Sequence, residues 1–379
     1  ETPVRLCNFV DVYRNWAITQ KLSENFMIAS AKETEIAKCS IHKGQVAITK
    51  DSETRDDIGI PAYIADDFDN VLLGYHCALI TPNDDVLDGK YLNAFMHTRY
   101  IQKYFENNAS GSGQRYTLSN ETIFQIPILL PSLEVQKAIG NLLSNIDRKI
   151  ELNRQINDNL EKMAKQLYDY WFVQFDFPNE NGRPYKSSGG AMVWNEKLKR
   201  EIPKEWDNCT LEYYLIIKNG RDHKHLGNGI YPVYGSGGEI RKVDSFIYSG
   251  ESILMPRKGS LNNIMYVNDA FWSVDTMFYS EMKQPHCAKY VFYSIKDIDF
   301  TRWDSGTGVP SMTSSTLYSI LLVKPDADSL AKFDEIITPL FLMIKKNEMQ
   351  IVELTKQRDD LLPLLMNGQA SVNYHLSHD

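Results

Sequence analysis

Three glycine-containing stretches concentrate basic and polar side chains in the second half of the chain. They read NGRDHKHLGNG (219–229), GSGGEIRK (235–242) and PRKGSLNN (256–263). Arginine, lysine and serine side chains on loops can hold phosphate oxygens and donate hydrogen bonds to the edges of nucleic-acid bases. If the chain binds nucleic acid, these loops are the candidate surface. The side chains selected from these stretches are Arg221, His223, Lys224, Ser236, Arg241, Lys242, Arg257, Lys258 and Ser260.

Simpler interpretations of the same stretches stay open. PRKGSLNN also has the composition of a solvated hairpin tip. His223 and His225 have a spacing that a metal could use, but no further ligand follows nearby, so we predict no metal site. GSGG lacks the third glycine of a dinucleotide-binding loop and is predicted to be a turn.

Motifs that would indicate catalysis are absent from the sequence. There is no G-x-x-x-x-G-K-[ST], no H-E-x-x-H and no Pro-Pro dipeptide, which the amino-methyltransferase motif requires. The five cysteines are scattered and form no C-x-x-C, a distribution typical of reduced, buried thiols. We therefore predict no catalytic residue. An endonuclease site built from scattered carboxylates such as Asp56 and Asp57 stays open as an alternative.

An internal repeat supplies further candidate contacts. SGSGQRYTL (110–118) and SGTGVPSMT (305–313) begin 195 residues apart, and each precedes a proline-containing apolar run. Glycine lets a backbone approach phosphate closely, so we predict that residues in and after each glycine pair contact nucleic acid. These residues are Gln114, Arg115, Tyr116 and Ser311. The alternative is that the glycines only shape a turn.

The repeat extends into the globular parts of the chain. GQVAITK (44–50) resembles GESILMPRK (250–258), which makes Lys50 the counterpart of Arg257 and Lys258. Weaker candidates are Arg14, Lys43, Arg55 and His76, whereas Tyr75 and Trp272 are predicted to be core residues. Two modules that share a scaffold but differ in their loops are typical of related binding domains with different targets.

Two long helical patterns follow the repeated runs. Apolar residues and one asparagine recur every three or four residues, as in coiled-coil heptads. The first predicted seam is Leu142, Ile146, Ile150, Asn153, Ile156, Leu160, Met163 and Leu167. The second is Ile337, Leu340, Ile344, Asn347, Ile351, Leu354, Arg358, Leu361 and Leu365. We predict that the seams face each other in antiparallel fashion, although two independent amphipathic helices would show the same pattern.

Length and composition fit a multidomain soluble protein. The chain has 379 residues, 43% of them hydrophobic, and a net charge of −8. No apolar run approaches the roughly 20 residues that span a membrane, and the first residues do not resemble a signal peptide, so we expect a cytoplasmic protein. The negative charge means that local basic patches or a partner must supply the attraction to nucleic acid.

Several motifs, in order along the chain, resemble the specificity (S) subunit of a type I restriction-modification enzyme. They are LPSLEVQKAIGNLLSNIDRKIELN (130–153), LEKMAKQLYDYWFVQFDFPNENGRPYKSSGG (160–190), EIPKEWDNCTLEYYLIIKNG (201–220) and ILMPRKGSLNNIMYV (253–267). The first block departs from the pattern, because no I-P-x-x-W precedes its SGSG. We therefore expect that the beginning of the first domain is missing from this sequence.

The resemblance implies a fold of the α/β (α+β) class. Two globular target recognition domains are separated by two long helices, which form an antiparallel coiled coil with a pseudo-two-fold internal repeat. The expected segments are recognition domain 1 (1–131), central helix 1 (132–175), a linker (176–202), recognition domain 2 (203–325) and central helix 2 (326–379).

The resemblance also implies a non-catalytic subunit that recognises a bipartite site in double-stranded DNA. Each recognition domain would read one half of the site, and the helices would set the gap. The implied partners are two modification (methyltransferase) subunits with S-adenosylmethionine, and motor-nuclease restriction subunits with ATP and Mg, in a bacterial or archaeal cytoplasm. No cofactor is expected on this chain. A catalytic restriction endonuclease subunit and a coiled-coil scaffold that does not bind DNA stay open as alternatives.

Because the chain is acidic, we predict that it binds DNA weakly by itself and that the binding weakens further as salt rises. Adding the modification subunits should tighten the binding. Titration of a labelled duplex at two salt concentrations, with and without those subunits, measures both effects. Equally tight binding in the presence and absence of the subunits would contradict the prediction.

Overall fold

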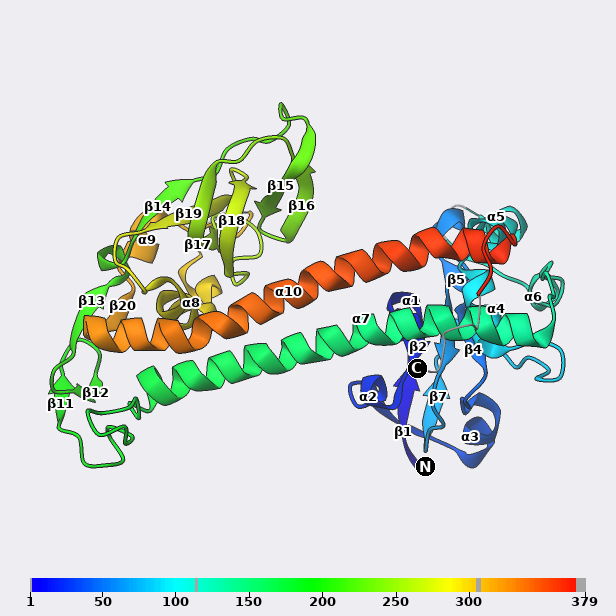
Figure 1. Ribbon diagram of the computed structural model, residues 1–379, viewed down its shortest axis with the longest axis horizontal. Coiled ribbons are helices and arrows are strands. Elements are labelled where there is room, and N and C mark those ends of the chain that lie inside the picture. The colour runs from blue at the N-terminus through cyan, green and yellow to red at the C-terminus, as the bar shows by residue number, and fades with distance from the viewer. Residues whose placement is uncertain (1, 113–114, 305–307, 373–379) are drawn as a thin grey trace, which may run out of the picture. The chain divides into compact units, whose positions relative to one another are not determined.

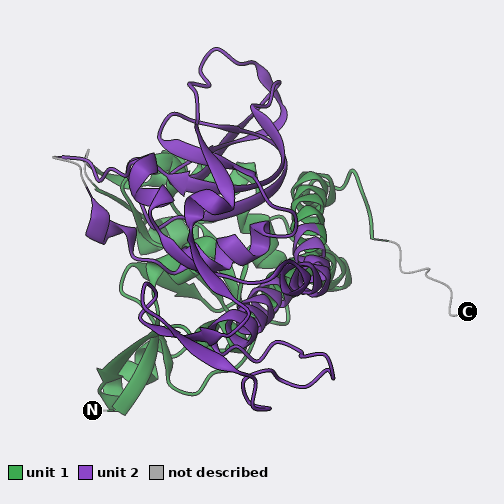
Figure 2. Cartoon of the chain, turned by 90° about the vertical axis from the view of Figure 1, so that its left-hand side faces the viewer, with its two compact units in different colours: residues 1–155, 346–379 green, residues 156–345 purple. Residues whose placement is uncertain are grey.

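The computed structural model describes residues 2–112, 115–304 and 308–372. The chain divides into two compact units (Figure 2). Unit 1 comprises residues 1–155 and 346–379, and unit 2 comprises residues 156–345. Both units mix strands and helices, as the predicted fold class requires. Among the described residues, no helix is long and apolar enough to cross a membrane.

Two long helices each contribute one half to unit 1 and the other half to unit 2. They are α7 (Leu133–Tyr168) and α10 (Ala327–Met366) (Figure 1). A single π-helical turn, Asp169–Val173, follows α7. Gly368 follows α10 with φ +74°, a conformation that favours glycine after a helix.

Asp326 caps the N-terminus of α10. Its carboxylate accepts hydrogen bonds from the backbone N–H of Ser329 at 2.8 Å and from the Ser329 hydroxyl at 2.7 Å. Trp206, the tryptophan of the I-P-x-x-W motif, donates its indole N–H to the same side chain at 2.8 Å. Burial alone would raise the Asp326 pKa, but these hydrogen bonds outweigh it and lower the pKa. The motif at 202–206 is therefore tied to the beginning of α10.

Unit 1 contains three small sheets. The first has the order β3-β1-β7, the second β2-β6-β4-β8 and the third β5-β10-β9. The strands are β1 (Thr2–Cys7), β2 (Ala17–Ile18), β3 (Met27–Ala31), β4 (Val46–Thr49), β5 (Asp51–Ser52), β6 (Pro61–Ile64), β7 (Val71–Leu73), β8 (Cys77–Ile80), β9 (Ser110–Ser112) and β10 (Arg115–Thr117). The shorter helices are α1 (Phe9–Arg14), α2 (Gln20–Ser23), α3 (Glu33–Cys39), α4 (Gly89–Met96), α5 (Arg99–Asn108) and α6 (Asn120–Phe124), with a 3-10 turn at Arg55–Asp57.

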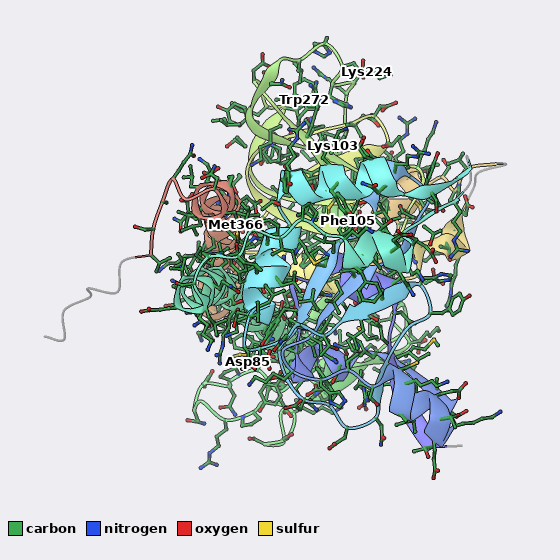
Figure 3. The ribbon with its side chains drawn as sticks, turned by 90° about the vertical axis from the view of Figure 1, so that its right-hand side faces the viewer. Asp85, Lys103, Phe105, Lys224, Trp272 and Met366 are labelled. Atoms are coloured by element: carbon green, nitrogen blue, oxygen red, sulfur yellow. The ribbon has the colours of Figure 1, made fainter. Side chains whose placement is uncertain are left out.

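The core of unit 1 joins its globular part to both long helices. Helix α5 is amphipathic: Figure 3 shows Lys103 and Phe105 on this helix, and Phe105 is fully buried. The Phe105 ring fills the space beside Gly59, where a Cβ would lie 2.3 Å from a ring carbon. From α7 the same core receives Ile139 and Leu143, and from α10 it receives Leu362, Leu365 and Met366.

Unit 2 is built on a six-stranded sheet with the order β14-β19-β17-β18-β15-β16, beside two smaller sheets, β11-β12 and β13-β20. The strands are β11 (Met192–Asn195), β12 (Arg200–Pro203), β13 (Asp207–Thr210), β14 (Leu215–Asn219), β15 (Asn228–Gly235), β16 (Gly238–Val243), β17 (Tyr248–Pro256), β18 (Met265–Ser273), β19 (Met277–Met282) and β20 (Leu321–Lys324). The helices are α8 (Ala288–Lys296) and α9 (Ser314–Tyr318), with 3-10 turns at Leu211–Tyr213 and Phe300–Trp303.

Aromatic side chains hold the long helices in the core of unit 2. The Phe172 ring, just after α7, lies 4.8 Å from Phe333 of α10 and 4.6 Å from Tyr290 of α8, both edge to face. Trp206 stacks on Phe177 at 4.6 Å. Such pairs stabilise by more than their buried area alone. The aromatic-rich LYDYWFVQFDF stretch (167–177) therefore contributes several of the buried side chains of this core.

One tyrosine contact occurs in both units. The Tyr91 hydroxyl in α4 donates to the carbonyl oxygen of Leu129 at 2.8 Å, and the Tyr290 hydroxyl in α8 donates to that of Val323 at 2.5 Å. Leu129 and Val323 lie 194 residues apart, just before the two long helices. The contact fixes the apolar run that leads into each helix, so the internal repeat is a repeat of structure as well as of sequence.

The long helices run antiparallel within each unit. In unit 1, Asn153 of α7 donates its amide to the side-chain oxygen of Gln350 at 2.9 Å. In unit 2, Asn157 donates to the carbonyl oxygen of Ile344 at 3.3 Å. Of the predicted seam, the fully buried members are Ile150, Asn153, Leu160, Ile337, Leu354 and Leu365, and the half-buried members are Leu142, Ile146, Leu167, Leu340, Ile344, Asn347, Ile351, Arg358 and Leu361.

Two predicted seam positions in α7 are wrong. Ile156 is 43% exposed and Met163 is 53% exposed, whereas their neighbours Asn157 and Ala164 are buried. Alternating steps of three and four from Ile150 lead through Asn157 and Ala164. The prediction followed the apolar residues and took two steps of three in succession, which moved it off the buried face.

Arg358, the charged member of the second seam, is held by an aromatic ring and a carboxylate. Its guanidinium lies 4.6 Å from the Trp16 ring centre, and its Nη1 lies 3.4 Å from Asp147 Oδ1. Burial raises the Asp147 pKa to about 6, because the neighbouring Arg358 and Arg154 only partly offset the loss of solvation.

Replacing Asp147 with Asn should make unit 1 more stable at neutral pH. Between about pH 4 and about pH 6 the folded carboxyl keeps a proton that the unfolded one has lost. The wild type therefore loses stability as pH rises through this window, by up to about 3 kcal/mol. Urea unfolding of wild type and Asp147→Asn at pH 4 and pH 8 measures this, and we expect the variant's advantage only at pH 8.

Asp360→Asn, at an exposed position of α10 in the same unit, is the matched control and should show no comparable advantage. An Asp147→Asn variant that is less stable than wild type at pH 8 would show instead that the ion pair with Arg358 outweighs the burial of the carboxylate.

Candidate nucleic-acid interface

Backbone hydrogen bonds bring the predicted loops of unit 2 together. The N–H of Arg257 donates to the carbonyl oxygen of Thr276 at 2.8 Å, and the carbonyl oxygen of Arg257 accepts from the N–H of Met312 at 2.8 Å. Three segments distant in sequence therefore meet at Arg257. They are the loop after β17, the turn between β18 and β19, and the stretch before α9.

Unit 1 has the same junction at Lys50. Its N–H donates to the carbonyl oxygen of His76 at 2.8 Å, and its carbonyl oxygen accepts from the N–H of Leu118 at 2.9 Å. Leu118 and Met312, which are both buried, anchor the last segment in each unit. The structure thus makes Lys50 the counterpart of Arg257.

The junctions also refine the offset of the repeat. Leu118 and Met312 lie 194 residues apart, one fewer than the 195 between the two SGSG and SGTG segments. Ser119 and Thr313, which follow them, cap α6 and α9 by accepting from backbone N–H groups three residues on. The difference of one residue therefore falls between the second glycine of each segment (Gly113 and Gly308) and the junction residue (Leu118 and Met312), where the two copies differ in sequence.

In unit 1, polar side chains gather around Asp51. Arg115 Nη2 lies 3.1 Å from Asp51 Oδ2, and His76 Nδ1 lies 2.8 Å from the same oxygen. Partial burial would raise the Asp51 pKa, but hydrogen bonds from His76 and Thr117 and the charge of Arg115 outweigh it and lower the pKa. Asp51 is therefore a carboxylate at neutral pH.

Other predicted residues of unit 1 border this cluster. Lys50 Nζ lies 3.4 Å from Asn120 Oδ1, and the Arg55 guanidinium lies 5.0 Å from the Tyr116 ring centre. Gln114 lies outside the described residues. The prediction that Tyr75 is a core residue is wrong, because its side chain is 92% exposed next to His76. It stands in the tight turn between β7 and β8, which leaves its ring no core to enter.

In unit 2, Arg241 folds back onto the loop 219–229. It donates to the ring of His223 at 3.1 Å and to the carbonyl oxygens of His223 and Leu226 at 2.6 and 3.0 Å. Trp272, which is buried as predicted, donates its indole N–H to the carbonyl oxygen of Arg221 at 2.9 Å. Figure 3 shows Lys224 near the outer end of the unit. The loop therefore has a fixed base and presents an exposed lysine.

A second contact joins the turn 235–238 to the loop 256–263. The Asn263 amide donates to the carbonyl oxygen of Ser236 at 2.9 Å. Gly259, at φ +87°, lies against the Ser236 side chain, so a Cβ there would come within 2.9 Å of the hydroxyl. Ser311 donates its N–H to Asp304 at 2.7 Å. The remaining predicted side chains, which are all exposed, are Lys242, Lys258 and Ser260.

The described part of the chain offers no cluster of side chains that would hold a metal. All five cysteines are free. Burial raises the pKa of Cys77 and Cys287 to about 12 and that of Cys209 to about 11, so these thiols are protonated at neutral pH and are poor nucleophiles.

Comparison with known proteins agrees with this geometry. Residues 10–162 match the type I restriction modification DNA specificity domain. The chain is 26% identical over 378 residues to the type I restriction enzyme MjaIX specificity subunit of Methanocaldococcus jannaschii, which covers 90% of this chain and 81% of that protein. Along most of its length, the chain is similar to the specificity subunits of type I restriction-modification enzymes.

One further relative resembles part of the chain, and one solved structure shares its fold. The type I restriction enzyme HindI specificity subunit of Haemophilus influenzae is 31% identical over 141 residues, which is 37% of this chain and 30% of that protein. The crystal structure of the type I S subunit from M. genitalium shares the fold, with a TM-score of 0.59 and 18% identity over 87% of this chain and 84% of that one. These likenesses support a DNA-recognising subunit over a catalytic one.

The sequence-based predictions missed Asp51 and Asn263 as parts of the candidate surface. Asp51 directly follows Lys50, but aspartate is not among the residue types expected to contact bases or phosphates. Asn263 lies at the end of PRKGSLNN. Both residues lie next to side chains that were predicted to contact nucleic acid, and this proximity could have identified them. Their contacts, however, are with segments that are distant in sequence.

Arg241 and its neighbour Lys242 should have separable roles in this chain. Arg241→Met removes the donors to two loop carbonyls and should lower the unfolding free energy by about 1–3 kcal/mol. Hydrogen exchange of the loop 219–229 should accelerate as well. Lys242→Met, at an exposed position, should change stability by less than about 0.5 kcal/mol. Unchanged exchange in Arg241→Met would contradict the supporting role of Arg241.

Proposed function

We propose that the chain is a specificity subunit that reads a bipartite DNA site, with one half-site for each unit. The observation that carries the proposal is the junction at Lys50 and Arg257, which has the same backbone hydrogen bonds in both units but different side chains around it. A shared scaffold with divergent loops gives two readers of different base sequences.

The proposed DNA contacts are the predicted loop residues, with different tasks. Exposed Lys224, Lys242 and Lys258 are suited to phosphate, because ammonium groups on flexible stems supply charge without demanding one geometry. Arg257 and Ser260 lie closer to the junction and are proposed to reach base edges. Arg241 is proposed to act by holding its loop.

The proposed spacer is the pair of long helices. At 1.5 Å per residue, the 36 residues of α7 and the 40 residues of α10 correspond to helices of roughly 54 and 60 Å. A rigid antiparallel pair would fix the number of base pairs between the two half-sites. The gap would then depend on the helix length and not on the recognition loops.

The proposed partners are two methyltransferase subunits and, for restriction, motor-nuclease subunits. The outer faces of the helices carry exposed apolar side chains, among them Leu152, Met163, Met349 and Val352, and such patches often mark protein interfaces. S-adenosylmethionine would reside on the methyltransferase subunits and ATP with Mg on the motor-nuclease subunits, with no cofactor on this chain. Partner subunits would also supply positive charge that this acidic chain lacks.

Methylome sequencing tests the proposal directly. The chain is expressed with its cognate modification subunit in a host without adenine methylation, and methylated adenines are mapped by long-read sequencing. We expect a motif of two short half-sites around a fixed gap. No methylation, once complex formation is verified, would favour a scaffold without DNA binding. Cleavage of DNA by the isolated chain with a metal ion would favour a hidden endonuclease.

Two variants separate the readers from the spacer. Replacing residues 203–325 with the same region of another specificity subunit should change one half-site and leave the other half and the gap intact. Removing seven residues from each long helix shortens it by about 10 Å, so the gap should shrink by about three base pairs. A swap that changes both halves, or a deletion that leaves the gap unchanged, would contradict the model of two readers and one spacer.

A further inference from the structure

The polar cluster of unit 1 combines an exposed arginine with a carboxylate that holds it. Arg115 stands at the start of β10, and its side chain is 58% exposed. Asp51 stands in β5, the neighbouring strand, and only 18% of its side chain is exposed. The Arg115–Asp51 pair therefore has its acid against the protein and its guanidinium toward solvent.

Among the described residues, the contacts of the Arg115 guanidinium are made through a single nitrogen. Within the described part of the chain, Asp51 and His76 both lie near its Nη2, and because His76 Nδ1 donates to Asp51, Asp51 is the acceptor for Nη2. Nε and Nη1 have no recorded partner there. Arg241 is different, because its guanidinium donates to two backbone carbonyls of the loop 219–229. Arg241 thus supports a loop, whereas Arg115 is held at Nη2 and leaves its Nε and Nη1 donors available for a ligand.

His76 gives Asp51 a second anchor. The same oxygen of Asp51 that faces Arg115 lies 2.8 Å from His76 Nδ1, and the backbone of His76 is fixed by the junction at Lys50. The Asp51 backbone is held by the pairing of β5 with β10, where Asp51 lies opposite Thr117. The carboxylate consequently has a defined position from which to orient the arginine.

A carboxylate within a DNA-facing surface has an electrostatic cost, because it repels phosphate. Asp51 stays ionised because its hydrogen bonds and the Arg115 charge lower its pKa. A carboxylate at this place therefore favours DNA recognition only if it has an effect that a neutral side chain would lack. A guanidinium that is already held in one orientation loses less conformational entropy when it binds. Its ordered N–H donors match the O6 and N7 acceptors of guanine.

We propose that Arg115, oriented by Asp51, reads a guanine in the half-site that unit 1 recognises. The inference rests on the proposed function, since it assigns one base within the bipartite site. Arg115 is the specificity-determining residue and Asp51 is a positioning residue. Lys50, which precedes Asp51 and reaches Asn120 rather than the cluster, contacts phosphate without base preference.

Methylome sequencing of variants tests the assignment. Unit 1's half-site is the half that stays unchanged when residues 203–325 are swapped. We expect the wild-type motif to contain guanine in that half. Arg115→Gln should lower the preference for guanine at one position by about 10- to 100-fold and leave every other position as in the wild type. Arg115→Lys, which keeps the charge but lacks the planar fork, should relax the same position.

Asp51→Asn should relax that same position to a smaller degree, because Arg115 loses its charged anchor. Lys50→Ala is the matched control: binding should weaken evenly across sequences, and the slope of affinity against salt should fall by about one, with the motif unchanged. Thermal unfolding of each variant verifies the fold. A purely structural role for Asp51 would lower methylation at all sites together and would not alter preference at one base, which would contradict the assignment.

The outcomes separate the inference from the proposed function. No methylated motif with the wild-type complex would overturn the proposed function, and the inference with it. A bipartite motif without guanine in unit 1's half, or an Arg115→Gln variant that retains the guanine preference, would overturn the inference alone. A change with Asp51→Asn but not with Arg115→Gln would show that Asp51 accepts directly from a cytosine amino group, which also overturns it.

Discussion

The structure depends on apolar side chains that the long helices share with the globular cores. Helices of 36 and 40 residues cannot rely on intrinsic propensity for a fixed position. Phe333 and Ile337 of α10 enter the core of unit 2, and Leu143 of α7 with Leu362 of α10 enter the core of unit 1. Each core is thus completed by both helices, so each globular part packs together with its share of the long helices.

This sharing explains how loops can diverge without loss of the fold. The bonds that carry the junction at Lys50 and Arg257 are made by backbone groups, and its anchors, Leu118 and Met312, are apolar and buried. Neither depends on the side chains that face outward. Arg115 and Asp51 in one unit and Arg257 and Ser236 in the other can therefore differ in chemistry while the framework stays the same.

Charge has two tasks in this acidic chain. Buried ions fasten the helices to the domains: Lys289 in α8 donates to Glu251 of β17 at 2.7 Å and to Asp334 of α10 at 2.8 Å, and Arg358 lies between Trp16 and Asp147. Replacing Glu251 or Asp334 would be costly, because the buried Lys289 charge would lose a partner. Other lysines, among them Lys224, Lys242 and Lys258, are exposed at the surface that we propose to face DNA. A net charge of −8 would limit their attraction to phosphate.

The sequence by itself determined the fold class, the internal repeat, the two long helices and the loops that carry the candidate contacts. Heptad spacing, glycine-rich turns and the aromatic stretch after the first helix are local patterns, and local patterns survive in a linear sequence. Only the tertiary structure decided the phase of the first seam, where Asn157 and Ala164 replace Ile156 and Met163. A polar residue can occupy a buried face when the opposite helix offers it a hydrogen bond, as Ile344 does for Asn157. A small residue such as Ala164 can occupy that face where the opposite helix leaves little space. It also decided that Arg241 supports a loop while Arg115 is held by Asp51, 64 residues earlier. These roles follow from contacts between distant segments, which residue types and spacing do not encode.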